Sequence, residues 1–431
     1  MRCVVLLIQN KRDRFLVGGL VEKSVSHAPW TALVLSGGGA RGAYEAGVIR
    51  YLRDEMPARI RAHMRFEVIC GTSVGAINCC FLATYNHAPE IQGQALADIW
   101  QRLNIEGVYR VGLRELLSIP KFLFGSRGRG ELDEAIGPGR LGGFFDTSPL
   151  EQLVRRGTRW KNIGANLASG DLKALAVIAT HVGSGQTHVF VQRSEPGLPA
   201  WSTDPQVQAF HVEIGPNHAL ASAAIPWIFP SVEIEGEVYC DGGIKLNTPI
   251  SPAVRLGADR LLVVGLKTSQ KEKNINSLPI DRYPSALFLL GKILNALMLD
   301  KTEYELKRLE RINALLDAKD ELKKDLSKTL NNIVTPLRGA PYRPIETLVI
   351  RPSEDIAKIA GRHLRQGGVA ARAGGLIGPL LRRIGGGAED QANDLLSYLL
   401  FDGEFAHDLI QLGMHDADAQ RQEIIDFFDA S

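Results

Sequence analysis

Short apolar runs alternate with segments of helical periodicity along the early part of this 431-residue chain. Residues 32–35 and 68–70 are continuous apolar runs and predict buried strands. Residues 43–53 and 76–85, which follow them, carry apolar side chains at the spacing of a helix. Strands and helices that alternate in this way predict a three-layer α/β/α core around a mainly parallel sheet.

The rest of the chain adds strands and long helices to this pattern. Residues 172–179 and 187–192 flank a glycine-containing turn and predict a hairpin, so the sheet is expected to be mixed. Residues 260–266 and 347–351 predict further strands. From 284 to about 328, apolar residues recur at helical spacing among charged ones, which predicts one or two long helices. Packing of these helices against the core is favoured over the alternative, a mobile lid.

The order of these elements divides the chain into three parts. We expect an N-terminal extension at residues 1–29, an α/β domain at 30–356 and a helical C-terminal region at 357–431. The α/β domain contains a helical insertion at about 281–335. The helical end of the chain is acidic from residue 390 onward.

A serine on a glycine-bounded turn is the first candidate for chemistry. Residues 71–75, Gly-Thr-Ser-Val-Gly, directly follow the second predicted strand and match G-x-S-x-G. Gly71 and Gly75 lack the Cβ atoms that would collide where the chain reverses from strand to helix, and they permit strained backbone angles. Such a turn presents a serine hydroxyl outward, so Ser73 is the candidate nucleophile.

A second glycine-rich turn follows the first predicted strand. Its backbone N–H groups, at the start of a helix, can hold the oxyanion of an acyl-transfer reaction. The same turn matches G-x-G-x-x-G, the fingerprint of a dinucleotide site. That site needs an acid near the end of the second strand, whereas the only acid of this strand is Glu67, at its start, so a nucleotide site is disfavoured. The turn consists of Gly37, Gly38, Gly39, Ala40, Arg41 and Gly42.

An aspartate on a third turn completes the set of motifs. Asp241 ends a short predicted strand and precedes Gly242 and Gly243. The three motifs, in this order, resemble those of the patatin-like phospholipase family, and residues 221–230 and 247–249 are similar to the family as well. The resemblance covers roughly residues 30–270 and implies that residues 30–356 are a patatin-like catalytic domain.

The resemblance implies a catalytic Ser–Asp dyad. Ser73 would be the nucleophile and Asp241 the base that removes its proton, with no histidine between them. The N–H groups of Gly38, Gly39 and Ala40 would stabilise the oxyanion. A partly buried carboxylate can act as this base when its pKa is raised toward the working pH.

The resemblance also implies an activity, a lipid acyl hydrolase of the phospholipase A or lysophospholipase type that works through an acyl-enzyme. Two alternatives stay open, an acyltransferase on the same dyad and a catalytically silent membrane-binding module. A Ser–His–Asp triad is disfavoured because the histidines after Asp241, which are His363, His407 and His415, fall in predicted helices rather than after strands. Arg41 is expected to anchor its turn, for instance through a carboxylate, or else to face a lipid phosphate.

Composition indicates the setting of this enzyme. A hydrophobic content of 45% supports a large core, and a net charge of +2 gives no indication of nucleic-acid binding. No apolar run approaches the roughly 18 residues of a membrane span, and the N-terminus lacks the pattern of a signal peptide. We expect a cytoplasmic protein, peripheral at the membrane at most, with a phospholipid or lysophospholipid substrate and with no cofactor or metal.

Cysteines and basic segments complete the sequence-based expectations. The five cysteines are spaced for neither a disulfide framework nor zinc, which suits a reducing compartment. Residues 108–129 and 358–383 combine basic and apolar side chains and are candidates for a transient contact with an anionic membrane surface. The alternative is a solvated basic face that pairs with the acidic C-terminal end.

Overall fold

The computed structural model describes residues 29–111, 143, 145–199, 201, 204–268, 286–298, 301–316, 321–338, 340–373, 378 and 393–429. The predicted N-terminal extension lies outside the described residues up to position 28. The same holds for residues 112–129 of the first basic segment and for 374–377 and 379–383 of the second.

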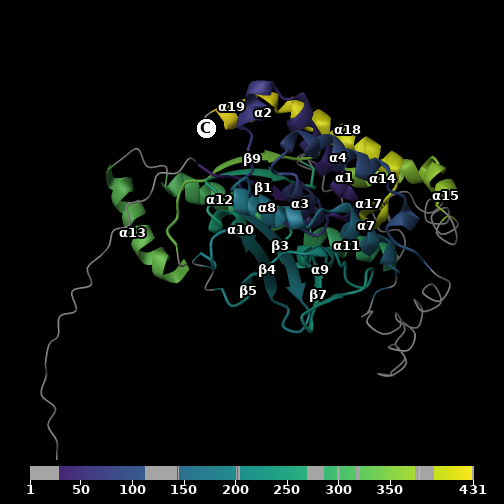
Figure 1. Cartoon of the computed structure of the whole chain (residues 1–431), viewed down its shortest axis with the longest axis horizontal. Coiled ribbons are helices and arrows are strands. Elements are labelled where there is room, and N and C mark those ends of the chain that lie inside the picture. The colour runs from purple at the N-terminus through teal and green to yellow at the C-terminus, as the bar shows by residue number, and fades with distance from the viewer. Residues whose placement is uncertain are drawn as a thin grey trace, which may run out of the picture.

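A mixed, mainly parallel sheet forms the centre of the fold (Figure 1). Among the described residues its strand order is β5-β4-β3-β2-β1-β8-β9, with β7 paired to β3 and β6 paired to β7. Parallel pairs join β1 to β2 and β8, β2 to β3, β8 to β9 and β4 to β5, while β3–β4, β3–β7 and β6–β7 are antiparallel. The strands are β1 (Thr31–Leu35), β2 (Val68–Thr72), β3 (Ala174–His181), β4 (Thr187–Arg193), β5 (Val207–His211), β6 (Val232–Ile234), β7 (Glu237–Asp241), β8 (Arg260–Val264) and β9 (Glu346–Ile350).

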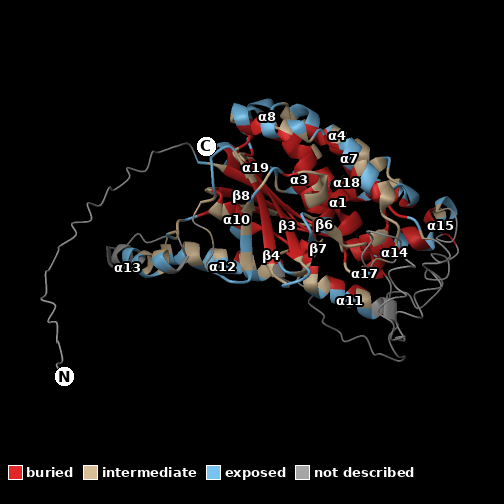
Figure 2. Cartoon of the chain, turned by 60° about the horizontal axis from the view of Figure 1, so that its bottom comes forward, coloured by how far each residue is buried: buried red, intermediate tan, exposed pale blue. Residues whose placement is uncertain are grey.

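Two hydrophobic clusters cover opposite faces of this sheet, and Figure 2 shows the buried residues concentrated in the strands and in the helix faces toward them. Along β1, Leu33 and Leu35 belong to one cluster and Ala32 and Val34 to the other. This is the alternation expected of side chains along a strand. A parallel strand buried on both faces must be apolar throughout, which is why the central strands are continuous apolar runs. The predicted three-layer α/β/α core is confirmed.

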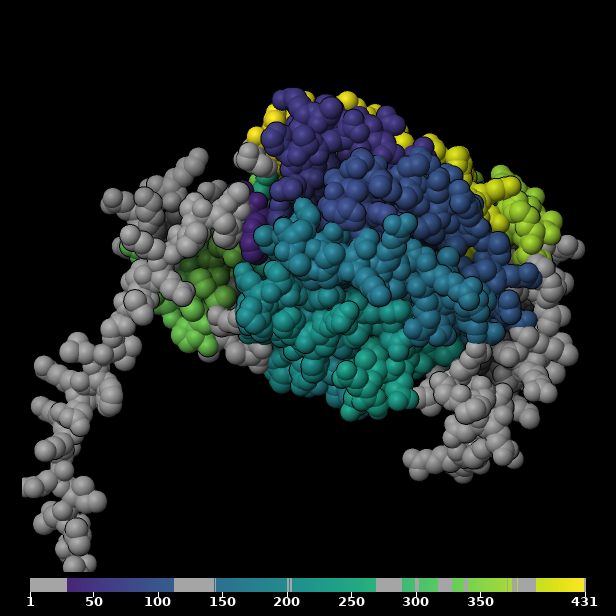
Figure 3. Space-filling model, in the orientation of Figure 1, coloured from purple at the N-terminus to yellow at the C-terminus, as the bar shows by residue number. Residues whose placement is uncertain are grey.

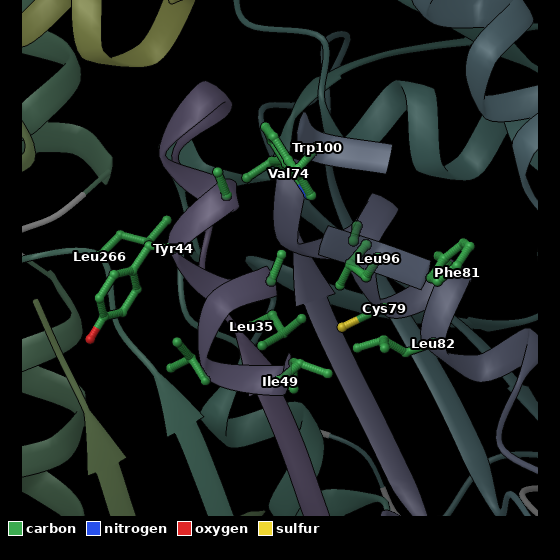
Figure 4. Packing of buried hydrophobic residues seen from close by; sticks show 14 of the residues in the cluster. Leu35, Tyr44, Ile49, Val74, Cys79, Phe81, Leu82, Leu96, Trp100 and Leu266 are labelled. Atoms are coloured by element: carbon green, nitrogen blue, oxygen red, sulfur yellow. The ribbon is translucent and has the colours of Figure 1, made fainter. Parts of the chain in front are cut away.

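Helices from both ends of the chain form the outer layers. Figure 4 shows Ile49 of α1, Cys79 of α3 and Leu96 of α4 packed near Leu35 of β1. Helices α10 and α12 contribute to the cluster on the opposite face. The helices are α1 (Gly42–Arg50), α2 (Ala58–His63), α3 (Val74–Thr84), α4 (Pro89–Gln101), α7 (Ser148–Gly157), α8 (Lys161–Ser169), α9 (Pro216–Ser222), α10 (Ile250–Arg255), α11 (Ala286–Met298), α12 (Lys301–Leu316), α13 (Glu321–Arg338), α14 (Ile356–Arg365), α15 (Gly368–Arg372), α17 (Asn393–Leu399), α18 (Gly403–Ala419) and α19 (Arg421–Asp429).

The C-terminal helices lie along the N-terminal helices of the core, as the yellow and purple segments of Figures 1 and 3 show. Where α18 packs against α1, the Tyr44 hydroxyl donates to Asp416 at 3.1 Å. The Tyr51 hydroxyl, just beyond α1, donates to Asp418 at 2.6 Å. The C-terminal region is therefore part of the layer that covers one face of the sheet. None of the described helices is long and apolar enough to cross a bilayer.

In the described part of the predicted helical insertion there are three helices, α11, α12 and α13, so the prediction of one or two is wrong. The sequence at 299–300 and 317–320 contains neither glycine nor proline, the residues by which a helix end is recognised in a sequence. The expected packing on the core is present: Thr302 of α12 shares a 2.7 Å hydrogen bond with Thr248, and Asn313 bonds the main chain of Ile345.

Candidate active site

Ser73 lies between the end of β2 and the start of α3. Its backbone has a φ of 55° and a ψ of −129°, a conformation that is costly for a residue with a side chain. The Ser73 N–H donates to Ser222 Oγ at 2.8 Å, and Ser222 Oγ in turn donates to the carbonyl of Ile178. These bonds hold the strained turn in place, as expected where strain serves a site.

Gly71 and Gly75 permit this turn for a steric reason. A Cβ atom at Gly71 would lie 2.4 Å from the carbonyl oxygen of Gly75. A Cβ atom at Gly75 would lie 2.7 Å from the carbonyl oxygens of Leu35 and Ser36. Since these contacts involve main-chain atoms, a larger residue at either position would move the backbone that carries Ser73.

Asp241 reaches Ser73 because β7 pairs with β3 at the point where β3 leaves β2. Ser73 Oγ donates to Asp241 Oδ2 at 2.6 Å, and Asp241 Oδ1 accepts from the Gly243 N–H at 2.7 Å. Only 1% of Ser73 and 0% of Asp241 are exposed. The two side chains are thus in direct contact with no histidine between them.

The Asp241 carboxyl is held in an apolar setting that favours its neutral form. Burial raises its pKa to about 7, while the hydrogen bonds from Ser73 and Gly243 act in the opposite direction. The backbone at Gly242 packs closely on β3, since a Cβ atom there would lie 2.3 Å from the carbonyl oxygen of Ile178. A carboxyl group with a pKa near neutrality can both take and return a proton, which is what acid–base catalysis requires.

The glycine-rich turn lies beside Ser73. The N–H of Gly37 donates to the carbonyl of Asn247 at 3.1 Å, so it is already engaged. Within the described part of the chain, the N–H groups of Gly38 and Gly39 have no hydrogen-bond partner. The N–H groups of Gly38 and Gly39, both expected to hold an oxyanion, are therefore available, whereas the N–H of Gly37, in the same turn, is not.

The remaining residues of the turn shape its path into α1. Gly39 has a φ of 57°, and a Cβ atom there would lie 2.3 Å from the carbonyl oxygen of Tyr398. Gly39, Ala40 and Arg41 form the short helix η1 (Gly39–Arg41). At Gly42, the first residue of α1, a Cβ atom would lie 2.6 Å from a methyl group of Val74, which Figure 4 shows in the core.

Arg41 anchors the glycine-rich turn to helices of the C-terminal half. Its Nε donates to Ser397 Oγ at 2.9 Å, its Nη2 donates to Asn295 Oδ1 at 3.2 Å, and its guanidinium lies 4.2 Å from the centre of the Tyr398 ring. The prediction of a carboxylate partner is wrong, because α11 and α17 present neutral polar and aromatic groups to Arg41. With 3% of Arg41 exposed, little of it remains for a lipid phosphate.

Two polar residues of the site, Ser222 and Asn247, received no role from the sequence. Ser222 accepts the N–H of Ser73. Asn247 makes two hydrogen bonds to Gly37. Its main-chain carbonyl accepts the Gly37 N–H, and its side-chain Nδ2 donates to the Gly37 carbonyl at 3.1 Å. Ser222 lies in the stretch 221–230 and Asn247 in the stretch 247–249, on either side of Asp241. Their place in these two stretches was the only feature of the sequence that indicated a role for them.

Two of the four basic residues of the second segment that the structure describes are ion-paired. Arg362 pairs with Glu354, and Arg372 pairs with Asp402 at 2.8 Å and Glu404 at 2.7 Å. Asp402 and Glu404 belong to the acidic C-terminal end. These pairs favour the internally paired basic face for Arg362 and Arg372 and leave Lys358 and Arg365 of α14 exposed.

Histidines stand outside the Ser–Asp pair. His363 lies on α14, and His407 and His415 lie on α18. His181 and His188 stack on the β3–β4 hairpin with ring centres 4.8 Å apart, and burial lowers the pKa of His188 to about 4. Among the residues that the structure describes, no group of three or more His, Cys, Asp or Glu could hold a metal ion.

Comparison with known proteins identifies a matching family model and a curated relative. The model, described as patatin-like phospholipase, matches residues 33–254. The relative, from Pseudomonas aeruginosa (strain BWHPSA011 / Pa011), is named cGAMP-activated phospholipase and is 28% identical over 223 residues. These residues are 50% of this chain and 53% of the relative, so the chain spans about half the length of the curated relative it matches.

A comparison with solved structures aligns the chain with two proteins at low sequence identity and low TM-score. The alignment with VipD from Legionella pneumophila covers 89% of this chain and 67% of the VipD chain, at 15% identity and a TM-score of 0.31. The alignment with a chain of the heterodimeric ExoU–SpcU complex from the type III secretion system of Pseudomonas aeruginosa covers 92% of this chain and 76% of that chain, at 16% identity and a TM-score of 0.26. TM-scores of this size carry no argument about function.

Proposed function

The chain belongs to the patatin-like phospholipase family, and on that basis we propose that it is a serine lipid acyl hydrolase acting through a Ser73–Asp241 dyad. Its substrates in this proposal are the carboxylic esters of phospholipids or lysophospholipids. The observation that carries it is the 2.6 Å hydrogen bond from Ser73 Oγ to a buried Asp241, made from a turn of positive φ beside unpaired N–H groups.

In the first half of the proposed reaction, Asp241 acts as a general base. It takes the proton from Ser73 Oγ as this oxygen bonds to the ester carbonyl carbon. The carbonyl oxygen becomes an oxyanion, which the N–H groups of Gly38 and Gly39 stabilise. The bond to the lipid alcohol then breaks, the leaving oxygen takes the proton from Asp241, and the acyl group stays on Ser73.

In the second half, water releases the fatty acid by the reverse use of the same groups. Asp241 takes a proton from the water as the water oxygen attacks the acyl carbon. The bond from that carbon to Ser73 Oγ breaks, and Ser73 recovers its proton from Asp241. Losing one oxyanion donor should cost on the order of 3 kcal/mol in either half.

The proposal assigns residues 30–356 to the catalytic domain and 357–431 to a helical region that supports it. Support for this assignment comes from Arg41 and Gly39, which contact Ser397 and Tyr398 of α17. The glycine-rich turn of the domain is therefore held by the C-terminal region, and we expect removal of that region to abolish activity.

We also propose a transient contact with an anionic membrane through exposed cations. Lys358 and Arg365 of α14 are exposed, and each charge near such a surface contributes about 1 kcal/mol. Replacing both with glutamine should lower turnover on anionic vesicles but leave turnover of a soluble short-chain ester unchanged. The difference should disappear in about 1 M salt, where the Debye length falls to about 3 Å. An equal loss on both substrates would contradict the membrane contact.

Fatty-acid release from vesicles of defined phosphatidylcholine and from the corresponding lysophospholipid tests the proposed activity. The wild type is compared with Ser73→Ala, Asp241→Asn and, as a matched control, Ser184→Ala on the exposed β3–β4 turn. Each assay is run with and without cGAMP, because the matched relative is named for activation by that nucleotide. Both dyad variants should lose about 10³-fold or more in turnover. A folded Ser73→Ala protein with turnover within tenfold of the wild type would refute the dyad, and product analysis would reveal acyl transfer to an alcohol.

A further inference from the structure

Glu45 is a buried carboxyl group that the proposed reaction does not use. It lies in the first turn of α1, which begins at Gly42, the last residue of the glycine-rich turn. None of its surface is exposed, and its Oε1 has no hydrogen-bond partner among the residues that the structure describes. Burial of a polar group without a full set of partners is costly, so its presence beside the active site requires an explanation.

The other oxygen of Glu45 takes part in a chain of hydrogen bonds that joins three helices. Asn78 of α3 donates from Nδ2 to Glu45 Oε2 at 2.8 Å and to the Gly42 carbonyl at 3.3 Å. Trp100 of α4 donates from Nε1 to Asn78 Oδ1 at 3.1 Å, which fixes the orientation of the amide. Both side chains are buried. The chain of bonds therefore ties α1, which follows the glycine-rich turn, to α3, which follows Ser73.

Close packing at the same place leaves little room for these helices to shift. A Cβ atom at Gly42 would lie 2.6 Å from a methyl group of Val74 and 3.0 Å from Cζ2 of Trp100. Val74 directly follows Ser73, and Figure 4 shows it next to Trp100. The end of the glycine-rich turn thus contacts the residue after the nucleophile, and the Asn78 amide bonds the main chain at that point.

The Glu45 carboxyl also contacts the beginning of the glycine-rich turn. Burial raises its pKa well above the ordinary value, while hydrogen bonds from Asn78 and from the main chain of Ser36 act in the opposite direction. The raised pKa favours the neutral carboxyl group, which accepts hydrogen bonds as an amide oxygen does. Ser36 directly precedes Gly37. Glu45 is therefore linked to the main chain where the turn begins and, through Asn78, where it ends.

We propose that Glu45 and Asn78 are positioning residues for the glycine-rich turn, an inference that rests on the proposed dyad hydrolysis. Together they hold the N–H groups of Gly38 and Gly39 at a fixed distance from Ser73 Oγ. Both act through the main chain of the turn and through α3 rather than by contact with the substrate. Because a displacement of about 1 Å can cost about 100-fold in rate, a fixed distance supports every step that passes through the oxyanion.

An alkyl trifluoromethyl ketone tests this geometry without turnover. Ser73 Oγ bonds to the ketone carbon, the Ser73 proton passes to Asp241, and the ketone oxygen becomes an oxyanion that the turn must hold. The inhibition constant Ki therefore reports the placement of the oxyanion donors relative to Ser73. It is measured together with kcat and KM for a 4-nitrophenyl fatty-acid ester and with the free energy of unfolding in urea.

Three variants change the chain of hydrogen bonds. Glu45→Leu removes the acceptor for Asn78 and should lower kcat and raise Ki, each about 30-fold, with KM within about threefold of the wild type. Glu45→Gln keeps an acceptor oxygen and should restore kcat and Ki to within about threefold. Trp100→Phe keeps the packing on Gly42 but removes the donor that orients Asn78, and it should change kcat and Ki in the same directions by about fivefold.

Asn166→Leu on α8 is the matched control for loss of stability. Asn166 is 3% exposed, and its Nδ2 donates at 2.7 Å to the carbonyl of Ala83, near the opposite end of α3 from Ser73. Its replacement should lower the free energy of unfolding but leave kcat and Ki within about threefold of the wild type.

Wild-type values of kcat and Ki in Glu45→Leu would overturn the positioning role. A loss in Asn166→Leu as large as that in Glu45→Leu would overturn it as well, because the effect would then follow stability and not the geometry of the turn. If Glu45→Leu does not fold, unchanged constants in Trp100→Phe would decide against the proposal. Ester hydrolysis that survives Ser73→Ala, or a wild type that the ketone does not inhibit, would instead refute the proposed function on which the inference rests.

Discussion

Replacement of Asp241 by asparagine should stabilise the protein while it abolishes activity. Burial raises the pKa of the Asp241 carboxyl to about 7, whereas an aspartate in an unfolded chain has a pKa of about 3.9. Between these values the folded protein keeps a proton that the unfolded chain has lost. By linkage, the free energy of unfolding falls as the pH rises from about 4 to about 7, and the whole loss is present above about 7.

The size of this effect follows from the difference in pKa. About three pKa units correspond to about 4 kcal/mol at pH 8, and the same relation gives about 1.5 kcal/mol at pH 5. Asparagine avoids this cost because it carries no charge. Its amide can still accept the Gly243 N–H and can donate to Ser73 Oγ, so the local contacts are kept. The stability advantage of Asp241→Asn over the wild type should therefore grow by about 2–3 kcal/mol from pH 5 to pH 8.

Urea unfolding followed by tryptophan fluorescence at pH 5 and pH 8 measures this advantage. Asp98→Asn, on the partly exposed face of α4, controls for the removal of one negative charge. An advantage of Asp241→Asn that is equal at the two pH values, or smaller at pH 8, would refute the conclusion that the buried carboxyl has a raised pKa. The same outcome would remove the physical reason for its use as a base near neutral pH.

Three further substitutions test the supports of the site. Ser222→Ala leaves the buried N–H of Ser73 without its acceptor and should lower the free energy of unfolding by about 1–3 kcal/mol and turnover by about tenfold or more, measured by urea unfolding and ester hydrolysis. Gly39→Ala places a Cβ atom 2.3 Å from the Tyr398 carbonyl at a φ of 57°, and we expect a lower melting temperature and a loss of fluorophosphonate labelling, with retention of both as the contrary result. Asp402→Ala removes the cap that accepts two N–H groups at the start of α18 and should cost about 1–2 kcal/mol in urea unfolding. If that cost is below about 0.5 kcal/mol, the cap is not important for α18.

The central strands and both glycine turns could be predicted because their causes are local. A parallel strand covered on both faces must be apolar along its length, so β1 and β2 were visible as short apolar runs. The turn at Ser73 needs glycines two residues away on either side, and this spacing is written in the sequence. The contact between Ser73 and Asp241 spans 168 positions, and only the resemblance of three motifs in order predicted it. By itself, Asp-Gly-Gly predicts no more than a turn.

Contacts that depend on tertiary packing could not be predicted. Arg41 was expected to meet a carboxylate, but its partners Asn295 and Ser397 lie 254 and 356 positions away on α11 and α17. No spacing rule connects segments so far apart. The two bonds between Asn247 and Gly37 are hidden for the same reason, because neither residue type nor local periodicity reveals which main-chain groups an amide will meet. The helical insertion was miscounted because its segments are not separated by glycine or proline.

The dyad is tested most directly by the rate at which a fluorophosphonate reagent labels Ser73, compared between the wild type and Asp241→Asn from pH 5 to pH 9. This reaction needs an activated hydroxyl and oxyanion donors, and it does not depend on the lipid substrate. Peptide mapping should find the adduct on Ser73 alone, with a rate that rises through a midpoint near pH 7 and that falls at least about 100-fold in Asp241→Asn. An adduct on another serine, or equal rates in the two proteins across the pH range, would contradict catalysis by Ser73 and Asp241.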